Sequence, residues 1–203
     1  MNSLTQIIGT YMLLVLTAIT VESAVFARAL GLSRLISLVD DTTDTVVFSI
    51  LLTVATTISG VLYYYAYSLF IEGVENEVYL RVFAVVLCMS VAFIIVFILA
   101  VKLMPYEYVG RAAEAMPAAT FNCMVFGTVM LTVAERMSLG KTIIFGIGSS
   151  LGFTLAVLLV TEGQRKLQNR DIPAAFKGLP ATLLYLAGLA IAMYGFTGRI
   201  FSL

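Results

Sequence analysis

The sequence predicts an all-α integral membrane protein with six transmembrane helices, arranged as two inverted three-helix repeats in which the first helix of each repeat is broken. Composition predicts the class, because 61% of the 203 residues are hydrophobic and 12% are charged, whereas a soluble domain carries about 25% charged residues. Long uncharged runs predict the helices, because roughly 20 apolar residues cross a bilayer and a lone spanning segment must be helical to satisfy its backbone.

Four segments predict uninterrupted spans. Each is an apolar run without Asp, Glu, Lys or Arg, it lies between charged residues, and it is long enough to cross a bilayer as a helix. These runs are residues 45–71, 82–101, 142–161 and 178–198.

Two further apolar segments contain polar residues and predict broken helices. A charge at the bilayer centre costs at least about 2.5–3.5 kcal/mol, so such groups usually line a path that protein encloses. The first segment, 4–38, contains Glu22, Arg28 and Arg34, and the second, 112–134, contains Glu114, Pro117, Thr120 and Asn122.

The order of these segments is interrupted, continuous, continuous in both halves of the chain. Interrupted segments at corresponding positions indicate inverted repeats with a site at their interface. The predicted repeats are residues 1–103 and 104–203, within one membrane domain. The alternative is that Gly31 and Pro117 merely kink two ordinary helices.

Loop charges favour the same arrangement. The positive-inside rule places the loops that are richer in Lys and Arg in the cytoplasm, which puts both termini outside. The richer loops hold Arg28, Arg34, Lys102, Arg111, Arg165, Lys166, Arg170 and Lys177, and the others hold Arg81, Arg136, Lys141 and Arg199.

Other features of the chain predict structural roles or exclude classes. Gly148 and Gly152 in "GIGSSLG" predict a small-residue face for close helix packing. Cys88 lies among apolar residues and predicts a core position. A net charge of zero without histidine offers no basic patch for nucleic acid, so membrane lipid and other subunits are the expected partners.

Cys123 is the candidate ligand of the chain. It follows Pro117 and Asn122 in "PAATFNCMVFG", residues 117–127, where a broken helix would direct backbone amides toward whatever the sulfur holds. A thiolate with such donors can bind a soft metal or an iron–sulfur cluster. One cysteine cannot hold a cluster, so further ligands must come from the first half of the chain or from a partner subunit. The alternative is a structural cysteine.

Five segments carry a family resemblance. Together they resemble the A subunit of Rnf-type ion-translocating electron transport complexes, and the related E subunit of the sodium-pumping NADH:quinone reductase. The segments are "VESAVFARALGLSRLISL" (21–38), "MPAATFNCMVFG" (116–127), "FGIGSSLGFTLAVLLV" (145–160), "RDIPAAFKG" (170–178) and "AGLAIAMYGFTG" (187–198).

The resemblance implies a subunit of a redox-driven translocase that is not catalytic alone and lies in a bacterial or archaeal cytoplasmic membrane. It implies a homologous sister subunit of the E type, and a [2Fe–2S] cluster at mid-membrane held by two cysteines from each partner. Electron transfer between ferredoxin and NAD through this cluster would be coupled to translocation of Na⁺ or H⁺. Cys123 matches the second family cysteine, in its Asn-Cys setting.

The chain departs from the family at the first cysteine, where it has Ser33 in Gly31-Leu32-Ser33-Arg34 instead of a Gly-Leu-Cys-Pro context. Three possibilities follow: a serine-ligated cluster, a cluster completed elsewhere, or no cluster. The last defines an alternative function, a cofactor-free ion-path or scaffold subunit. Glu22, Thr120 and Asn122 would then line the ion path.

Overall fold

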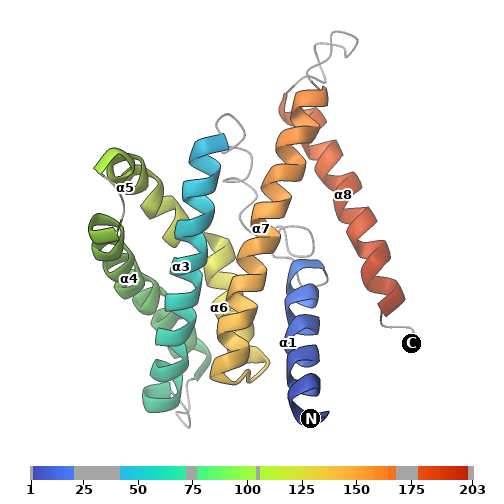
Figure 1. The fold of residues 1–203 in the computed structure, drawn as a ribbon. Helices are drawn as coiled ribbons and strands as arrows, with labels where there is room; N and C mark the ends of the chain where they lie inside the picture. Colours follow the sequence, from blue (N-terminus) through green and yellow to red (C-terminus); the bar gives the residue numbers. More distant parts are fainter. Residues whose placement is uncertain (1, 21–41, 72–76, 104–105, 168–177, 201–203) are drawn as a thin grey trace.

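The computed structural model describes residues 2–20, 42–71, 77–103, 106–167 and 178–200, and every regular element in these ranges is a helix (Figure 1). A π-helical stretch, η1, continues the second described helix. In chain order the elements are α1 (Asn2–Thr20), α3 (Thr42–Ala66), η1 (Tyr67–Ile71), α4 (Glu77–Leu103), α5 (Tyr106–Thr120), α6 (Cys123–Ala134), α7 (Leu139–Leu167) and α8 (Leu179–Ile200).

The described helices confirm the all-α membrane class. Three of them contain segments long and apolar enough to cross a bilayer, namely Thr45–Phe70, Tyr79–Lys102 and Leu139–Leu167. The bent pair α5–α6 makes a fourth candidate span if its two helices are taken together. Helices α1 and α8 contribute shorter apolar segments. The complete six-helix arrangement stays a prediction.

Consecutive helices run in alternating directions (Figure 1). In that view α1 and α4 rise, α3 and α5–α6 descend, α7 rises and α8 descends. The second predicted half therefore begins in the direction opposite to the first, as an inverted repeat requires. Alternation alone does not define a repeat, so the division into 1–103 and 104–203 also stays a prediction.

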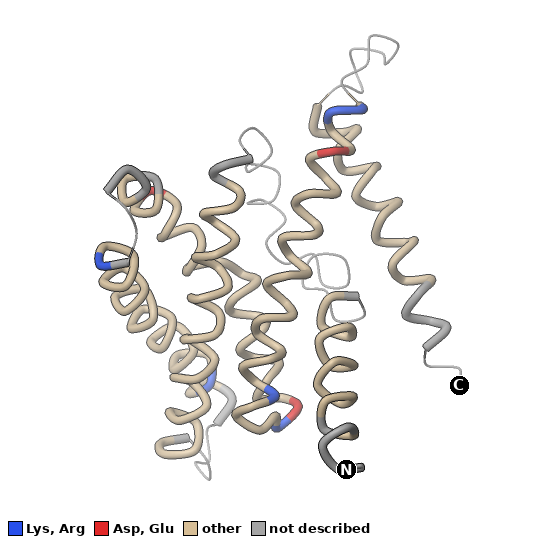
Figure 2. Tube along the Cα trace, viewed as in Figure 1, with Lys and Arg blue, Asp and Glu red and all other residues tan. Residues whose placement is uncertain are grey.

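Among the described residues, charged side chains gather toward the two ends of the bundle, and the middle of the described helices carries none (Figure 2). Lys102 lies in the last turn of α4, and Arg165 and Lys166 lie in the last turn of α7, at the same end. This distribution is the one that membrane embedding requires, because charges at the bilayer centre are costly. The side on which the two termini lie stays a prediction.

Helix α3 forms the centre of the bundle and packs against α4, α5, α6 and α7. Its fully buried side chains include Phe48, Leu52 and Tyr63, and the ring of Phe48 lies 6.1 Å from that of Phe153 on α7. Cys88 is 7% exposed in the same apolar core, which confirms the position predicted for it.

The contact between α1 and α7 confirms the predicted small-residue face. A Cβ atom added at Gly148 would lie 2.9 Å from the Cβ of Ala18, and one added at Gly152 would lie 3.2 Å from the Cα of Ile19. Both distances are shorter than ordinary contact, so only glycine allows the two backbones to approach this closely. The motif is therefore a packing surface.

Candidate functional site

The second predicted broken helix is broken in the structure. Helix α5 ends at Thr120, α6 begins at Cys123, and the segments on either side of the break are bent by 43°. Pro117 lies inside α5, and the Phe121 N–H still donates to the Pro117 carbonyl over 2.9 Å. The helix therefore continues past the proline, and the break falls at Phe121 and Asn122.

Asn122 ends one helix and starts the next. Its backbone is extended, with φ −108° and ψ 139°, and its side-chain Oδ1 accepts a hydrogen bond from the Met124 N–H over 3.2 Å. Asparagine is among the preferred N-cap residues because its oxygen satisfies an amide that has no partner within the helix. The local sequence thus explains why α6 begins at this point.

Two buried polar atoms at the break have no hydrogen-bond partner among the described residues. They are the Oγ1 of Thr120, a residue with no exposed surface, and the Nδ2 of Asn122, a residue that is 6% exposed. Leaving such a group unsatisfied costs about 1–3 kcal/mol. The break therefore contains two buried hydrogen-bonding groups that no described residue satisfies.

The side chains of the break alternate between the interior and the surface. Thr120 and Asn122 are buried, whereas Phe121 and Cys123 are exposed. The Phe121 ring lies 5.6 Å from that of Phe93 on α4. The Cys123 thiol therefore lies at the surface of this chain, beside a residue that packs against α4.

The described residues fit one ligand of a shared cluster and no more. None of them form a group of three or more His, Cys, Asp or Glu side chains that could hold a metal ion. The second cysteine of the chain, Cys88, is buried in α4. Ser33 and Glu22, the site residues predicted in the first half, lie outside the described residues. A complete set of cluster ligands would therefore need residues outside the described ranges or on another chain.

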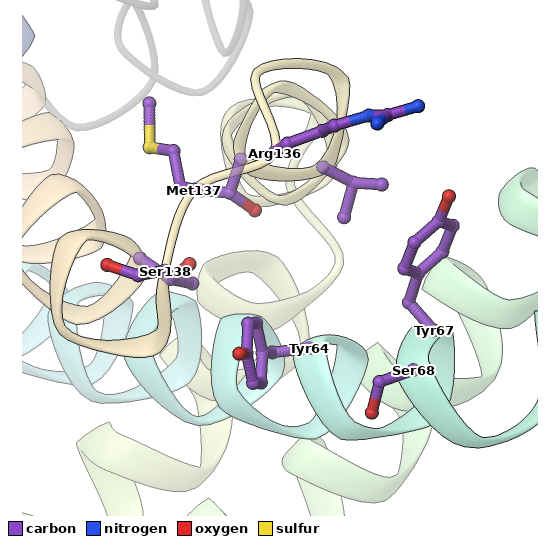
Figure 3. A pocket seen from close by; sticks show the side chains of 9 residues that line it. Tyr64, Tyr67, Ser68, Arg136, Met137 and Ser138 are labelled. Atoms are coloured by element: carbon purple, nitrogen blue, oxygen red, sulfur yellow. The ribbon is translucent and has the colours of Figure 1, made fainter. Parts of the chain in front are cut away.

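Sequence reasoning missed a second polar region. A cavity of about 330 Å³ lies where α3 and η1 meet the turn between α6 and α7 (Figure 3). Its lining comes from two stretches that are far apart in the chain, 64–68 and 132–142, which no single motif identifies. The lining residues are Tyr64, Tyr67, Ser68, Thr132, Val133, Arg136, Met137, Ser138 and Thr142.

The fold and the break together define an integral membrane protein in which two bent helices form a candidate discontinuous span. Residues 11–200 match the family described as Rnf-Nqr subunit, membrane protein. The chain therefore belongs to the Rnf-Nqr family of membrane subunits, as the resemblance of its motifs predicts.

Curated relatives match almost the whole chain. The A subunit of the ion-translocating oxidoreductase complex of Vibrio vulnificus is 27% identical over 190 residues, covering 94% of this chain and 98% of the relative. Its counterpart in Alcanivorax borkumensis is 29% identical, covering 94% and 97%. The A subunit of the Na⁺-translocating ferredoxin:NAD⁺ oxidoreductase complex of Acetobacterium woodii is 26% identical, covering 93% and 97%.

Proposed function

We propose that this chain is the A-type membrane subunit of an ion-translocating oxidoreductase complex. In this proposal it relays electrons between ferredoxin and NAD across the membrane through a [2Fe–2S] cluster shared with a homologous sister subunit, and the transfer is coupled to Na⁺ or H⁺ translocation. The observation that carries the proposal is the exposed Cys123 thiol at the break of a membrane span. Family membership and the names of the relatives support it.

Three features of the break suit Cys123 to this role. Asn122 fixes where α6 begins and so fixes the position of the residue after it. The N-terminal end of a helix favours negative charge, which suits a thiolate ligand on its first turn. A [2Fe–2S] cluster, when bound, supplies a one-electron carrier whose potential depends on charge and on hydrogen bonds to sulfur.

The remaining ligands belong to segments not described and to the sister subunit. Ser33 is the proposed second ligand from this chain, in the position where the family resemblance implies cysteine. The sister subunit would contact the surface that exposes Cys123 and Phe121 beside α4. Helix α4 suits such a contact, because only 28% of its most apolar segment is buried within this chain, compared with 56% for the corresponding segments of α3 and α7.

The direct test is the iron and acid-labile sulfide content of the purified complex carrying Cys123→Ala. We expect a loss of about two iron atoms per complex, together with the paramagnetic signal of the cluster. The matched control is Cys88→Ala, which removes the buried cysteine and should leave the iron content unchanged. Retention of iron in a Cys123→Ala complex that still contains this subunit would contradict the proposed ligand.

A second candidate function has one observation in its favour. Thr120 Oγ1 and Asn122 Nδ2, which have no partner among the described residues, would suit a polar path for ions, with Glu22 as a further member. The chain would then be a cofactor-free ion-path or scaffold subunit of such a complex. In that case the Thr120 hydroxyl is required for ion coupling, and Cys123 is dispensable. A separate alternative is that the chain is the equivalent subunit of a sodium-pumping NADH:quinone reductase.

A further inference from the structure

The cavity between α3, η1 and the α6–α7 turn has the chemistry of an anion site (Figure 3). Arg136 contributes the positive charge, and none of the described lining residues is Asp or Glu. No carboxylate in the described part of the chain forms an ion pair with Arg136; the ion pair found there joins Arg165 to Glu162, at the other end of α7.

Hydroxyl groups supply hydrogen-bond donors around the same cavity. Ser68 and Thr132 already donate to main-chain carbonyls, over 3.3 and 2.7 Å. Tyr64 and Ser138 also line the cavity, and their hydroxyls form no hydrogen bond within the described residues. Figure 3 shows the Tyr67 hydroxyl directed toward the Arg136 guanidinium, whereas Tyr64 and Ser138 lie on the other side of the cavity.

A second arginine reinforces the positive potential behind Tyr67. Nη2 of Arg81 donates to the Tyr67 hydroxyl oxygen over 3.1 Å, and its guanidinium lies 5.3 Å from the centre of that ring. A phenol oxygen that accepts from arginine keeps its own O–H available as a donor. The wall of the cavity formed by Tyr67 is thus suited to an anion.

The backbone of Arg136 is unusual for an arginine. The Met137 N–H donates to the Thr132 carbonyl and the Arg136 N–H donates to the Val133 carbonyl, which is the Schellman pattern that ends a helix. In this motif the residue after the C-cap is usually glycine, because its φ is positive. Arg136 has φ 47°, so an arginine occupies a position where glycine would be less strained.

The position of the cavity identifies the kind of anion. It lies at the end of the Thr45–Phe70 span, where a membrane helix reaches the headgroup layer and tyrosines are enriched. On η1 beside it, Leu69 and Phe70 are 72% and 78% exposed, and they present an apolar surface to acyl chains. A lipid phosphate group, which adjoins acyl chains, would fit both the headgroup-level cavity and the exposed apolar side chains beside it.

We propose that this cavity binds the phosphate of an anionic phospholipid headgroup. Arg136 supplies the charge, and the Tyr67 hydroxyl donates a hydrogen bond. The proposal is independent of the electron-transfer function and concerns a different part of the chain.

Native mass spectrometry of the full-length chain, purified in detergent with the subunits that accompany it, provides the test. The sample is offered equal amounts of phosphatidylglycerol and phosphatidylcholine, and the ratio of the two bound lipids is measured. We expect a preference for phosphatidylglycerol that falls roughly tenfold in Arg136→Gly, because a charged hydrogen bond is lost. The melting temperature of Arg136→Gly should be unchanged or higher, because glycine relaxes the left-handed backbone.

The matched control is Lys141→Gln, which removes an exposed charge from the same end of the bundle but does not line the cavity. It should keep the lipid preference. An equal loss of the phosphatidylglycerol preference in both variants would overturn the proposal, because the preference would then depend on the total charge at this end of the bundle and not on the cavity. Absence of a preference in the unmodified chain would also overturn it. Inorganic phosphate is tested separately, and stabilisation by phosphate without a lipid preference would assign the cavity to a free anion and overturn the lipid assignment.

Discussion

Helix α7 and the α5–α6 pair show two ways in which a membrane segment can carry polar residues. Helix α7 is continuous over 29 residues, and its Ser150, Thr154 and Thr161 hydroxyls donate to carbonyls four residues earlier, over 2.8, 3.0 and 2.8 Å. In α5–α6 the Thr120 hydroxyl and the Asn122 amide nitrogen have no partner within the described residues. The three hydroxyls of α7 are satisfied within their own helix, whereas the two groups at the break remain available to a ligand or an ion.

The largest effect is expected from filling the packing face of α7. Gly152→Leu places a side chain where a Cβ alone would meet the Ile19 carbonyl oxygen at 3.3 Å, and backbone atoms cannot move aside. Overpacking of this kind costs about 1–3 kcal/mol, so we expect a lower melting temperature and poor assembly of the purified complex. Gly188→Leu in α8 is the control, because a Cβ there meets nothing within 4 Å. Equal melting temperatures for the two variants would show that α1 and α7 do not require close contact.

An intermediate effect is expected from removing the cap of α6. Asn122→Ala loses the hydrogen bond to the Met124 N–H and should destabilise the chain by about 1 kcal/mol. Serine is also a good N-cap residue, so Asn122→Ser should recover most of that loss in a thermal unfolding measurement. If both variants unfold at the wild-type temperature, the cap does not set the start of α6.

The smallest effect on stability is expected at Thr120. Thr120→Val removes a hydroxyl that has no partner among the described residues, so stability should be unchanged or slightly higher. Thr161→Val, which removes a bonded hydroxyl from α7, should be slightly destabilising. Ion-dependent activity separates the two candidate functions. Its loss in a stable Thr120→Val complex supports the ion path, whereas unchanged activity counts against it.

The continuous helices were the part of the fold that the sequence predicted best. Uncharged runs of more than 18 residues leave little choice of structure in a bilayer, so 45–71, 82–101 and 142–161 correspond to α3 with η1, α4 and α7. Helix α7 extends beyond its apolar run, to Leu139 and Leu167, because nothing outside the hydrocarbon layer stops a helix at its first charged residue.

The break was predicted within residues 117–127, where the structure has it, but not at a particular residue. Pro117 has no N–H, but its own carbonyl still accepts from Phe121, so the helix ends only where Asn122 turns extended. The exposure of Cys123 could not be predicted, because apolar residues occupy most faces of α6 and the polar Thr128 and Thr132 lie on its buried face. The cavity at Arg136 was missed because helix C-termini are recognised by glycine, and this one has arginine.

The contact of α1 with Gly148 and Gly152 can form only after α7 has been synthesised, long after α1 itself. Ala18 leaves the ribosome roughly 130 residues before Gly148, which at ordinary rates of synthesis is a delay of several seconds or more. Throughout that interval α1 has lipid or the insertion machinery as its neighbour instead of α7. Closure of the bundle is therefore a late step, and a chain truncated before α7 would expose the face of α1 that normally meets these glycines.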